Sequence, residues 1–599
     1  MTTPSWDLSI AYNGFNDPKI ELDISAVQYS LSYLDKKAEQ LCSVSVLQQA
    51  LISKESAMTL LATLGTFAMC HESVDAKDTV AKQLSGRIDR LSSALIQAFS
   101  PYQDKLIHCG TNFLAQVLAD TSVASHAFLI NEQRELVDSR LSVKEEQLIT
   151  AMSVDGKDAW GRLYSNITGS MKVTLKLADG TTEILGFSQA ASILYGADRK
   201  RREPAWRAIQ VAMAENQESF SAILNALSGW RLTEYSKRSH TKPMHFLDPS
   251  LHANRIEQAT LESVLAVAKK NRAVGQKAGR LMAKMFATPS LKPWDQLAAM
   301  PPLTIAGNSA TVKTYSFADA IEIIKEAFTG VDPAMGSFVD TMVANNWIDA
   351  APQPNKRLGA FCTKFAGTRT PLVFMTWGGS MSDVITLAHE LGHAFHNWVM
   401  QDMPLCETRY PMTLAETASI FAENIVRDSL FDKASSNEQR IEMLWQEISS
   451  ALALLVNIPV RFEFEKKLYE QRQDNELTAE QLCSLMADTW QEWYGDTMTE
   501  VDTYFWASKL HFSIAGLSFY NYPYLFGYLF SKGVYAQRAV KGEQFYGDYV
   551  ALLRDTGRMK AEDVVRKHLN LDLTQADFWQ QSLDMVSEQI DKFEALLAV

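Results

Sequence analysis

Cysteine is scarce in this chain of 599 residues, which has six scattered cysteines and no C-x-x-C pair. Such spacing in a long chain predicts core thiols and excludes a disulfide framework. The N-terminal segment has no basic stretch followed by an apolar run, so we expect no signal peptide. The most apolar stretch, residues 451–460, is far too short to span a membrane. These absences predict a cytoplasmic protein.

An excess of basic residues is also missing. The chain has 57 Lys and Arg against 70 Asp and Glu, for a net charge of −13. An acidic surface argues against nucleic acid or an anionic membrane as a partner, and it is compatible with small peptides. The length exceeds what one ordinary core supports, so two or more domains are expected.

Short repeats, low-complexity tracts and Gly/Ser linkers are absent, and most of the chain has apolar residues at helical spacing. Strand signals are few. Residues 173–177 and 182–185 alternate around Asp179-Gly180, which predicts a hairpin. Residues 358–362 and 372–377 form a second candidate pair around a loop with Gly367. The fold class is therefore mainly α with minor β.

A candidate domain boundary lies near residues 195–198, after the first hairpin. It divides the chain into an N-terminal helical region with a β hairpin, residues 1–197, and a catalytic domain, residues 198–599. Neither this stretch nor the loop-rich one at 289–302 is a flexible linker, so we expect the parts to pack together.

The most informative motif is His389-Glu390-Leu391-Gly392-His393. Residues four apart lie on one face of a helix, so the two imidazoles can converge on a zinc ion. Glu390 can then reach a water on the zinc as general base. Ser380 or Ser382 can cap this helix, and Asp383 suits its first turn. The alternative is an amphipathic helix with two unrelated histidines.

A catalytic zinc usually takes three protein ligands and one water. A third histidine ten residues after the first is excluded, because position 399 is Val. Glu407, Glu416 and Glu423 are the candidates, and we favour Glu416, although Thr413-x-x-Glu416 is also a capping box. On spacing alone, ligand and cap remain open. Glu423 lies two turns further and can hydrogen-bond a zinc-bound histidine.

The segments 389–396 and 416–419 resemble the thimet oligopeptidase / oligoendopeptidase F family of zinc metallopeptidases, and the oligoendopeptidase F branch most closely. The resemblance also covers residues 359–362 and 519–524 and runs from about residue 200 to 585, and the smaller N-terminal helical part with its hairpin looks like that branch too. It implies Glu416 as third ligand. It also implies two helical lobes around a deep substrate channel, a gluzincin-like site, and a cleft-edge strand at 372–377 that pairs with extended peptides.

The resemblance further implies that a histidine and one or more tyrosines of the C-terminal region face the substrate. His511 ranks first as a donor to the oxyanion, followed by Tyr524, Tyr522 and Tyr528. For any single tyrosine, an aromatic place in the core is the alternative. The family's usual spacing is not reproduced cleanly here.

We therefore predict a zinc metalloendopeptidase with one Zn²⁺ per chain. It hydrolyses internal bonds of short oligopeptides by attack of a zinc-bound water, with Glu390 as general base. An alternative is a peptidyl-dipeptidase or carboxypeptidase, which needs a cation for the substrate's carboxylate. Arg357, Arg369 and Lys532 are candidates for that cation. A third possibility is a non-catalytic helical binding protein in which the motif is incidental or structural.

Overall fold

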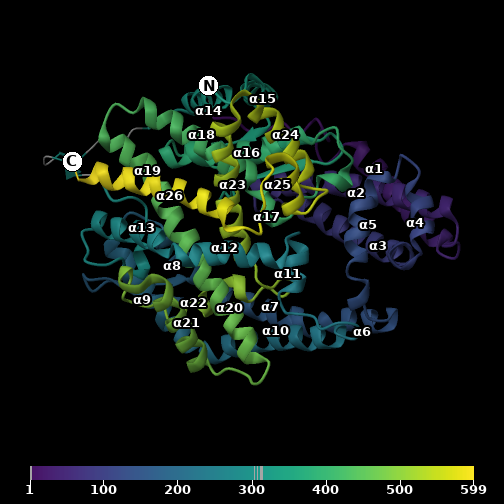
Figure 1. Cartoon of the computed structure of the whole chain (residues 1–599), viewed down its shortest axis with the longest axis horizontal. Helices are drawn as coiled ribbons and strands as arrows, with labels where there is room; N and C mark the ends of the chain where they lie inside the picture. The colour runs from purple at the N-terminus through teal and green to yellow at the C-terminus, as the bar shows by residue number, and fades with distance from the viewer. Residues whose placement is uncertain (1–2, 303, 306–307, 310–313, 599) are drawn as a thin grey trace. The chain divides into compact units, whose positions relative to one another are not determined.

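The computed structural model describes residues 3–302, 304–305, 308–309 and 314–598, and helices carry most of them (Figure 1). The chain divides into two compact units, each built from three separate segments. Unit 1 comprises Met1–Val137, Lys313–Asp432 and Gln537–Leu571, and unit 2 comprises Asp138–Val312, Lys433–Ala536 and Asp572–Val599. The predicted fold class, mainly α with minor β, is confirmed. The predicted domain boundary at residue 197 is a different division and stays a prediction.

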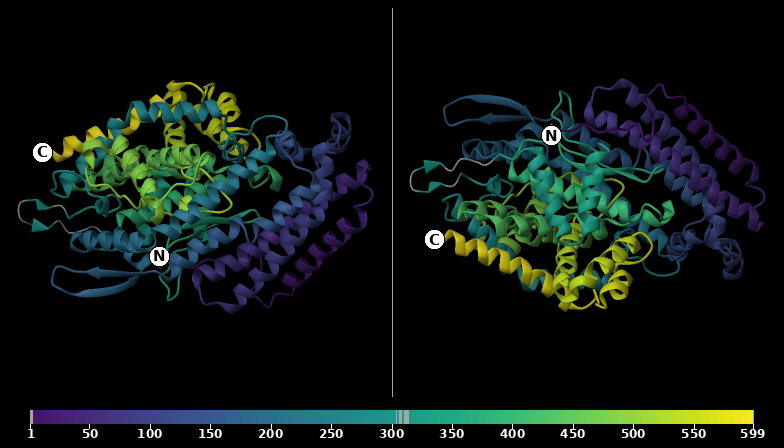
Figure 2. Two further views of the ribbon diagram at one scale, coloured as in Figure 1. Left: turned by 90° about the horizontal axis from the view of Figure 1, so that it is seen from below. Right: turned by 90° about the horizontal axis from the view of Figure 1, so that it is seen from above.

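Unit 1 begins with three long helices that run side by side (Figure 2). Asp17 and Asp78 start two of them, because their carboxylates accept hydrogen bonds from the first free backbone N–H groups. The elements of unit 1 are α1 (Pro18–Lys37), α2 (Val44–Val74), α3 (Thr79–His108), α4 (Thr111–Leu118), α5 (Ala127–Arg134), α14 (Phe317–Thr329), α15 (Pro333–Ala344), β5 (Ile348–Asp349), β6 (Phe361–Phe365), β7 (Thr370–Phe374), α16 (Met381–Val399), α17 (Met412–Ala415), α18 (Thr417–Lys433), α24 (Phe545–Asp555) and α25 (Ala561–Leu569).

The three-stranded sheet of unit 1 has the order β5-β7-β6. β7 is parallel to β5 and antiparallel to β6, and all five of its residues are buried. The prediction that residues 372–377 form an edge strand that pairs with substrate is therefore wrong. β7 lies in the centre, because the two-residue strand β5 pairs on one side of it and β6 pairs on the other.

Unit 2 consists mainly of helices, with the predicted hairpin at its edge, where β1 and β2 pair and Gly180 lies in the turn at φ +87° (Figure 2). Its elements are α6 (Val143–Ser153), α7 (Lys157–Ser170), β1 (Lys172–Lys176), β2 (Thr182–Gly186), α8 (Phe187–Ile193), α9 (Arg199–Glu215), α10 (Gln217–Arg238), α11 (Asp248–Ala253), α12 (Gln258–Lys270), α13 (Arg272–Met285), β3 (Thr304–Ile305), β4 (Asn308–Ser309), α19 (Asn437–Leu452), α20 (Ile458–Arg472), α21 (Ala479–Tyr494), α22 (Phe505–Ser508), α23 (Tyr522–Lys541, in unit 2 up to Ala536) and α26 (Ala576–Leu597).

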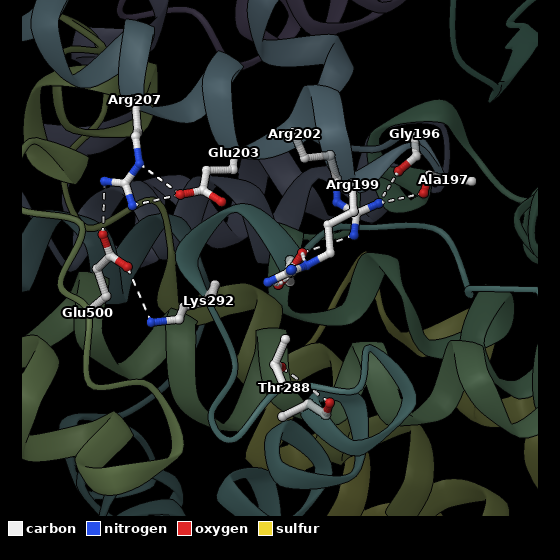
Figure 3. Close-up of polar contacts among 11 residues, drawn as sticks. Gly196, Ala197, Arg199, Arg202, Glu203, Arg207, Thr288, Lys292 and Glu500 are labelled. Atoms are coloured by element: carbon white, nitrogen blue, oxygen red, sulfur yellow. Dashed lines mark hydrogen bonds and ion pairs between the residues drawn. The ribbon is translucent and has the colours of Figure 1, made fainter. Parts of the chain in front are cut away.

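Buried ion pairs fasten α9 to the loop that follows α13. Asp295 has no exposed surface, and its carboxylate accepts hydrogen bonds from Arg202 NH2 at 2.9 Å and from Arg199 NH2 at 3.1 Å. Arg202 is also fully buried, and its NH1 donates to the carbonyls of Gly196 and Ala197 (Figure 3). Each buried charge is thus paired and hydrogen-bonded, as burial requires.

A second, exposed chain of charges lies nearby in Figure 3. Arg207 bonds Glu203 at 2.8 Å and Glu500 at 3.2 Å, and Glu500 also pairs with Lys292 at 3.4 Å. Exposed pairs of this kind contribute little to stability.

The run from Asn437 to Arg472 is the one described stretch with the length and hydropathy of a membrane span. It consists of α19, a five-residue π-helix and α20. In the structure, 72% of its most apolar 18-residue segment is buried, as expected for a helix in a protein core.

Candidate active site

Helix α16 carries the His-Glu-x-x-His motif and starts where the sequence predicts. Ser380 Oγ accepts a hydrogen bond from the Asp383 N–H at 3.1 Å, and Asp383 Oδ2 accepts one from the Ser380 N–H at 2.9 Å. This reciprocal capping box fixes the first turn. The helix packs across β6 and β7, which sets the direction of its histidines.

Gly392 lets α16 approach the start of α18 closely. A Cβ at this position would lie 2.5 Å from the carbonyl oxygen of Ala418 and 2.6 Å from Cα of Ser419. Both atoms belong to backbone, so any side chain would push the two helices apart. The glycine inside the motif therefore brings Glu416 within reach of the histidines.

Glu416 lies between α17 and α18 and is the C-cap residue of α17. The capping-box alternative does not describe it, because the N-cap of α17 is Pro411 without a side-chain bond. Ser419 Oγ donates to Glu416 Oε2 at 2.7 Å and orients the carboxylate.

Three potential ligand atoms converge at this point. His389 Nε2 lies 3.2 Å from His393 Nε2, and Glu416 Oε2 lies 3.4 Å from the first and 3.6 Å from the second. A tetrahedral zinc ion with ligands at about 2.0–2.1 Å places them about 3.3 Å apart. The size and chemistry of this triangle fit a zinc ion.

Glu423 and Arg427 form a chain of hydrogen bonds that ends at His389. Glu423 Oε1 lies 2.6 Å from His389 Nδ1, and Arg427 NH2 donates to Glu423 Oε2 at 3.1 Å. This contact leaves His389 Nε2 for the cluster. Burial lowers the pKa of His389, but the hydrogen bond and charge of Glu423 outweigh burial and raise it to about 9.

Glu390 is only 5% exposed, and its Oε2 has no hydrogen-bond partner among the described residues. Burial raises the pKa of Glu390 to about 7; the charge of His389 opposes this rise, and the carboxylates of Glu416 and Glu423 add to it. A carboxyl group that exchanges its proton near neutral pH is suited to general acid–base catalysis.

His396 follows on the same helix but does not join the cluster. Its Nε2 lies 2.9 Å from Thr556 Oγ1 and 3.1 Å from the Leu553 carbonyl oxygen. Its ring stacks on Tyr410 at a centroid distance of 4.2 Å. The fully buried ring is therefore a packing group of unit 1.

In unit 2, Arg461 fixes the hydrogen-bonding state of His511. Its NH1 lies 3.0 Å from His511 Nδ1 and donates to Asn521 Oδ1 at 3.3 Å. A guanidinium only donates, so Nδ1 accepts and the ring proton lies on Nε2. Burial, together with Arg461 and Lys509, lowers the pKa of His511 to about 4. At neutral pH, His511 is a neutral Nε2–H donor.

The predicted tyrosines fall into two groups. The ring of Tyr524 lies 6.3 Å from that of His511. The hydroxyl of Tyr522 donates to the Ser250 carbonyl at 3.1 Å, and that of Tyr528 donates to Glu447 at 2.6 Å. The structure therefore groups Tyr524 with His511 and gives the other two hydroxyls partners in the core of unit 2. The roles in catalysis of all four residues remain predictions.

Sequence reasoning missed Arg461 and the place of Tyr520, whose ring stacks on His511 at 5.3 Å. Arg461 lies 50 residues before His511 on a helix, and no local pattern singles it out among other arginines. Tyr520 belongs to the dense aromatic run, but spacing alone does not tell which ring faces the histidine.

Comparison with known proteins identifies the chain. The sequence model of peptidase family M3 matches residues 192–585, and that of oligopeptidase F matches residues 105–172. Oligopeptidase PepF of Bacillus subtilis (strain 168) is 21% identical over 583 residues, which cover 96% of this chain and 85% of the relative.

Two solved structures share the fold over nearly the whole chain. A candidate peptidase from Chlamydophila abortus has a TM-score of 0.83 at 20% identity and covers 99% of this chain and 98% of its own. Oligoendopeptidase F from Enterococcus faecium has a TM-score of 0.70 at 17% identity, with 96% and 99% covered. The matches and the donor set define a metalloendopeptidase. The chain belongs to peptidase family M3, in agreement with the predicted resemblance to the oligoendopeptidase F branch.

Proposed function

We propose that this metalloendopeptidase uses zinc and cleaves internal bonds of short peptides. The observation that carries the proposal is the triangle of His389, His393 and Glu416 with the buried Glu390 beside it. Two histidines and a glutamate with an open fourth position are a common donor set of catalytic zinc.

His389, His393 and Glu416 would hold the ion, which when bound supplies a Lewis acid that makes water reactive at neutral pH. Glu390 removes a proton from the attacking water as its oxygen bonds to the peptide carbonyl carbon. Glu390 then passes this proton to the amine nitrogen as the C–N bond breaks. Glu390 is again an ionised carboxylate at the end of the cycle.

We assign stabilisation of the oxyanion to His511 first and to Tyr524 second. The support comes from unit 2 itself, where Arg461 leaves the proton of His511 on Nε2. A neutral donor with a fixed tautomer suits an oxyanion, because its hydrogen bond strengthens as charge develops.

The outer strand β6 supports an extended peptide as substrate. Val373 and Met375 donate their backbone N–H groups towards β5, so by alternation β7 bonds β6 through Leu372 and Phe374. The backbone of Cys362 then points away from the sheet, where a peptide can pair with it whatever the peptide's side chains. Such pairing ends before Lys364, whose carbonyl accepts a hydrogen bond from Thr66 Oγ1 at 3.0 Å. This is the mode predicted above, moved from β7 to β6.

Replacing Glu390 with Gln tests the mechanism. Cleavage of a mixed peptide library, read by mass spectrometry, should fall by about 10²–10⁴-fold while zinc content stays at one ion at this site. Glu39→Gln, an exposed change in the same unit, is the matched control. Full cleavage by the Glu390→Gln protein with zinc bound would sink the proposal.

An exopeptidase on the same helix would need a free cation for the substrate's carboxylate. Lys532 pairs with Glu447 at 2.8 Å, and Arg357 pairs with Glu72 at 3.0 Å, so neither is a strong candidate. Arg369, whose Nη1 is buried with no hydrogen-bond partner among the described residues, stays open as the cation. Peptides amidated at the C-terminus distinguish the two activities, since only an endopeptidase should cleave them as well as the free acids.

We also propose that the enzyme works on peptides in the cytoplasm, with neither nucleic acid nor membrane as partner. The six cysteines are free thiols, and the net charge is −13, both of which support this assignment. Fractionation of cells that express the tagged chain tests it.

A further inference from the structure

A second cluster with the chemistry of a metal site lies in unit 1, apart from the motif on α16. It consists of Glu55 on α2, His126 at the end of the 3-10 turn η1 (Ala124–His126), and Cys406 in the 3-10 turn η4 (Leu405–Thr408). One ligand atom from each residue lies within 4.8 Å of the other two. We propose that these residues form a second, thiolate-containing site for zinc or a similar divalent ion.

The distance between the histidine and the glutamate in this cluster suits two ligands of a common ion. His126 Nε2 lies 3.3 Å from Glu55 Oε2, which is the edge length expected for a tetrahedral zinc ion, about 3.3 Å. Glu55 Oε1 accepts a hydrogen bond from the Cys406 N–H at 3.3 Å, so the carboxylate is already held against η4. Three elements far apart in sequence therefore present their donors to one point.

Two of the three side chains in this cluster are buried, unlike polar groups that meet by chance on a protein surface. His126 is 7% exposed and Cys406 is 8% exposed. His126 Nδ1 is buried without a hydrogen-bond partner among the described residues, while Nε2 faces the Glu55 carboxylate. An ion bound to the ring would give this buried imidazole a partner that the described protein groups supply only at Nε2.

The donor types select the class of metal. Thiolate and imidazole together favour zinc, cobalt and similar borderline ions over calcium and magnesium, which prefer oxygen. Three protein ligands leave a fourth position for water, and the Cys406 thiol donates a hydrogen bond to Ser125 Oγ at 3.4 Å.

Binding must remove a proton from the Cys406 thiol, which passes to solvent as the S–metal bond forms. Lys54, Arg369 and Arg409 lie close enough to interact with Cys406, and their positive charges oppose a bound cation. We therefore expect weaker binding than at the first cluster.

The site would fix the segment that leads to Glu416. Cys406 lies ten residues before Glu416, and between them Tyr410 stacks on His396. A metal at Cys406 would hold η4 against α2, at the base of this segment. The second ion would then be structural rather than catalytic.

Absorption spectroscopy with Co²⁺ distinguishes this site from the first cluster. A thiolate bound to Co²⁺ gives a near-ultraviolet charge-transfer band, and the first cluster has no sulfur ligand. We expect the full-length chain to bind two equivalents of Co²⁺ and to show the band. Cys406→Ser should lose the band and one equivalent. Cys483→Ser, a change at a half-buried cysteine of unit 2, should keep both.

Glu416→Ala gives the converse pattern, in which the band stays and the other cobalt is lost. The unmodified chain decides the question even if Cys406→Ser fails to fold. One equivalent of cobalt without a band overturns the proposal, and so does a band that persists in a folded Cys406→Ser protein. Neither outcome depends on peptide cleavage.

Discussion

Asp295 in unit 2 and Glu416 in unit 1 are both carboxylates in helical surroundings, but they face different partners. Asp295 is fully buried and receives the guanidinium groups of Arg199 and Arg202 at 2.9–3.2 Å. Glu416 has a side chain that is 27% exposed, and it faces two imidazole nitrogens at 3.4 and 3.6 Å.

The difference teaches what each cluster is for. Around Asp295 the positive charges are arginine side chains of the protein itself. The carboxylate is therefore neutralised without a bound ion, and the ion pairs stabilise the packing of α9. Around Glu416 the Ser419 hydroxyl donates one hydrogen bond, and the two imidazole nitrogens are electron-pair donors that a metal ion would join to the carboxylate. Four changes test this contrast, in order of expected effect.

Glu416→Ala should have the largest effect. With one of three ligands removed, zinc content at this site and peptide cleavage should both fall to the level of the chelated enzyme. Glu407→Ala is the matched control, because Glu407 pairs with Arg558 at 2.9 Å. Metal analysis of the two purified variants measures the result, and loss of zinc only in Glu407→Ala would reverse our assignment.

Asp295→Ala should cost about 3–5 kcal/mol of unfolding free energy, since it leaves the buried charge of Arg202 without a partner. Zinc content should not change. Glu203→Ala breaks only the exposed pair with Arg207 and should cost less than about 1 kcal/mol. Denaturant unfolding of both proteins gives the comparison, and equal costs would contradict the distinction between the two regions.

Glu423→Gln should weaken zinc binding by about 10–100-fold without removing a ligand. The neutral amide no longer holds the imidazole of His389 as the carboxylate does at 2.6 Å. Competition with a chromogenic chelator measures the affinity. Gln439→Glu, on α19 of unit 2, changes charge in the opposite sense and should leave the affinity unaltered.

The pH profile should show the smallest effect. Glu390 must be ionised to accept a proton, and burial raises its pKa from 4.5 to about 7. A bound cation lowers this value, so the acidic limb of kcat/KM should lie between pH 4.5 and 7, with activity lost as pH falls. A rate that stays constant down to pH 4 would exclude Glu390 as the base.

Local features were the ones that the sequence predicted well. The motif, its Ser380 cap and the hairpin around Gly180 all depend on residues within one or two turns of each other. Glu416 required the family resemblance, because spacing could not separate a ligand from a helix cap. Its place beside the histidines depends on the close approach at Gly392, which is a tertiary contact.

Features that depend on distant partners were not predictable. The position of β7 in its sheet is set by β5, a strand of only two residues with no pattern of its own. The hydroxyl of Tyr522 meets Ser250, 272 residues earlier in the chain, and that of Tyr528 meets Glu447. Each tyrosine is equally aromatic in the sequence, and only the fold separates them.

The division of each unit into three segments has a consequence for biosynthesis. The proposed metal ligands lie within 28 residues, from His389 to Glu416, and leave the ribosome almost together. Leu553 and Thr556, which bond His396, emerge about 160 residues later. The nascent chain therefore holds its donors long before the surrounding unit can close. We expect metal acquired during synthesis to exchange freely until α24 has been made, and the timing of translation then decides which ion the mature enzyme retains.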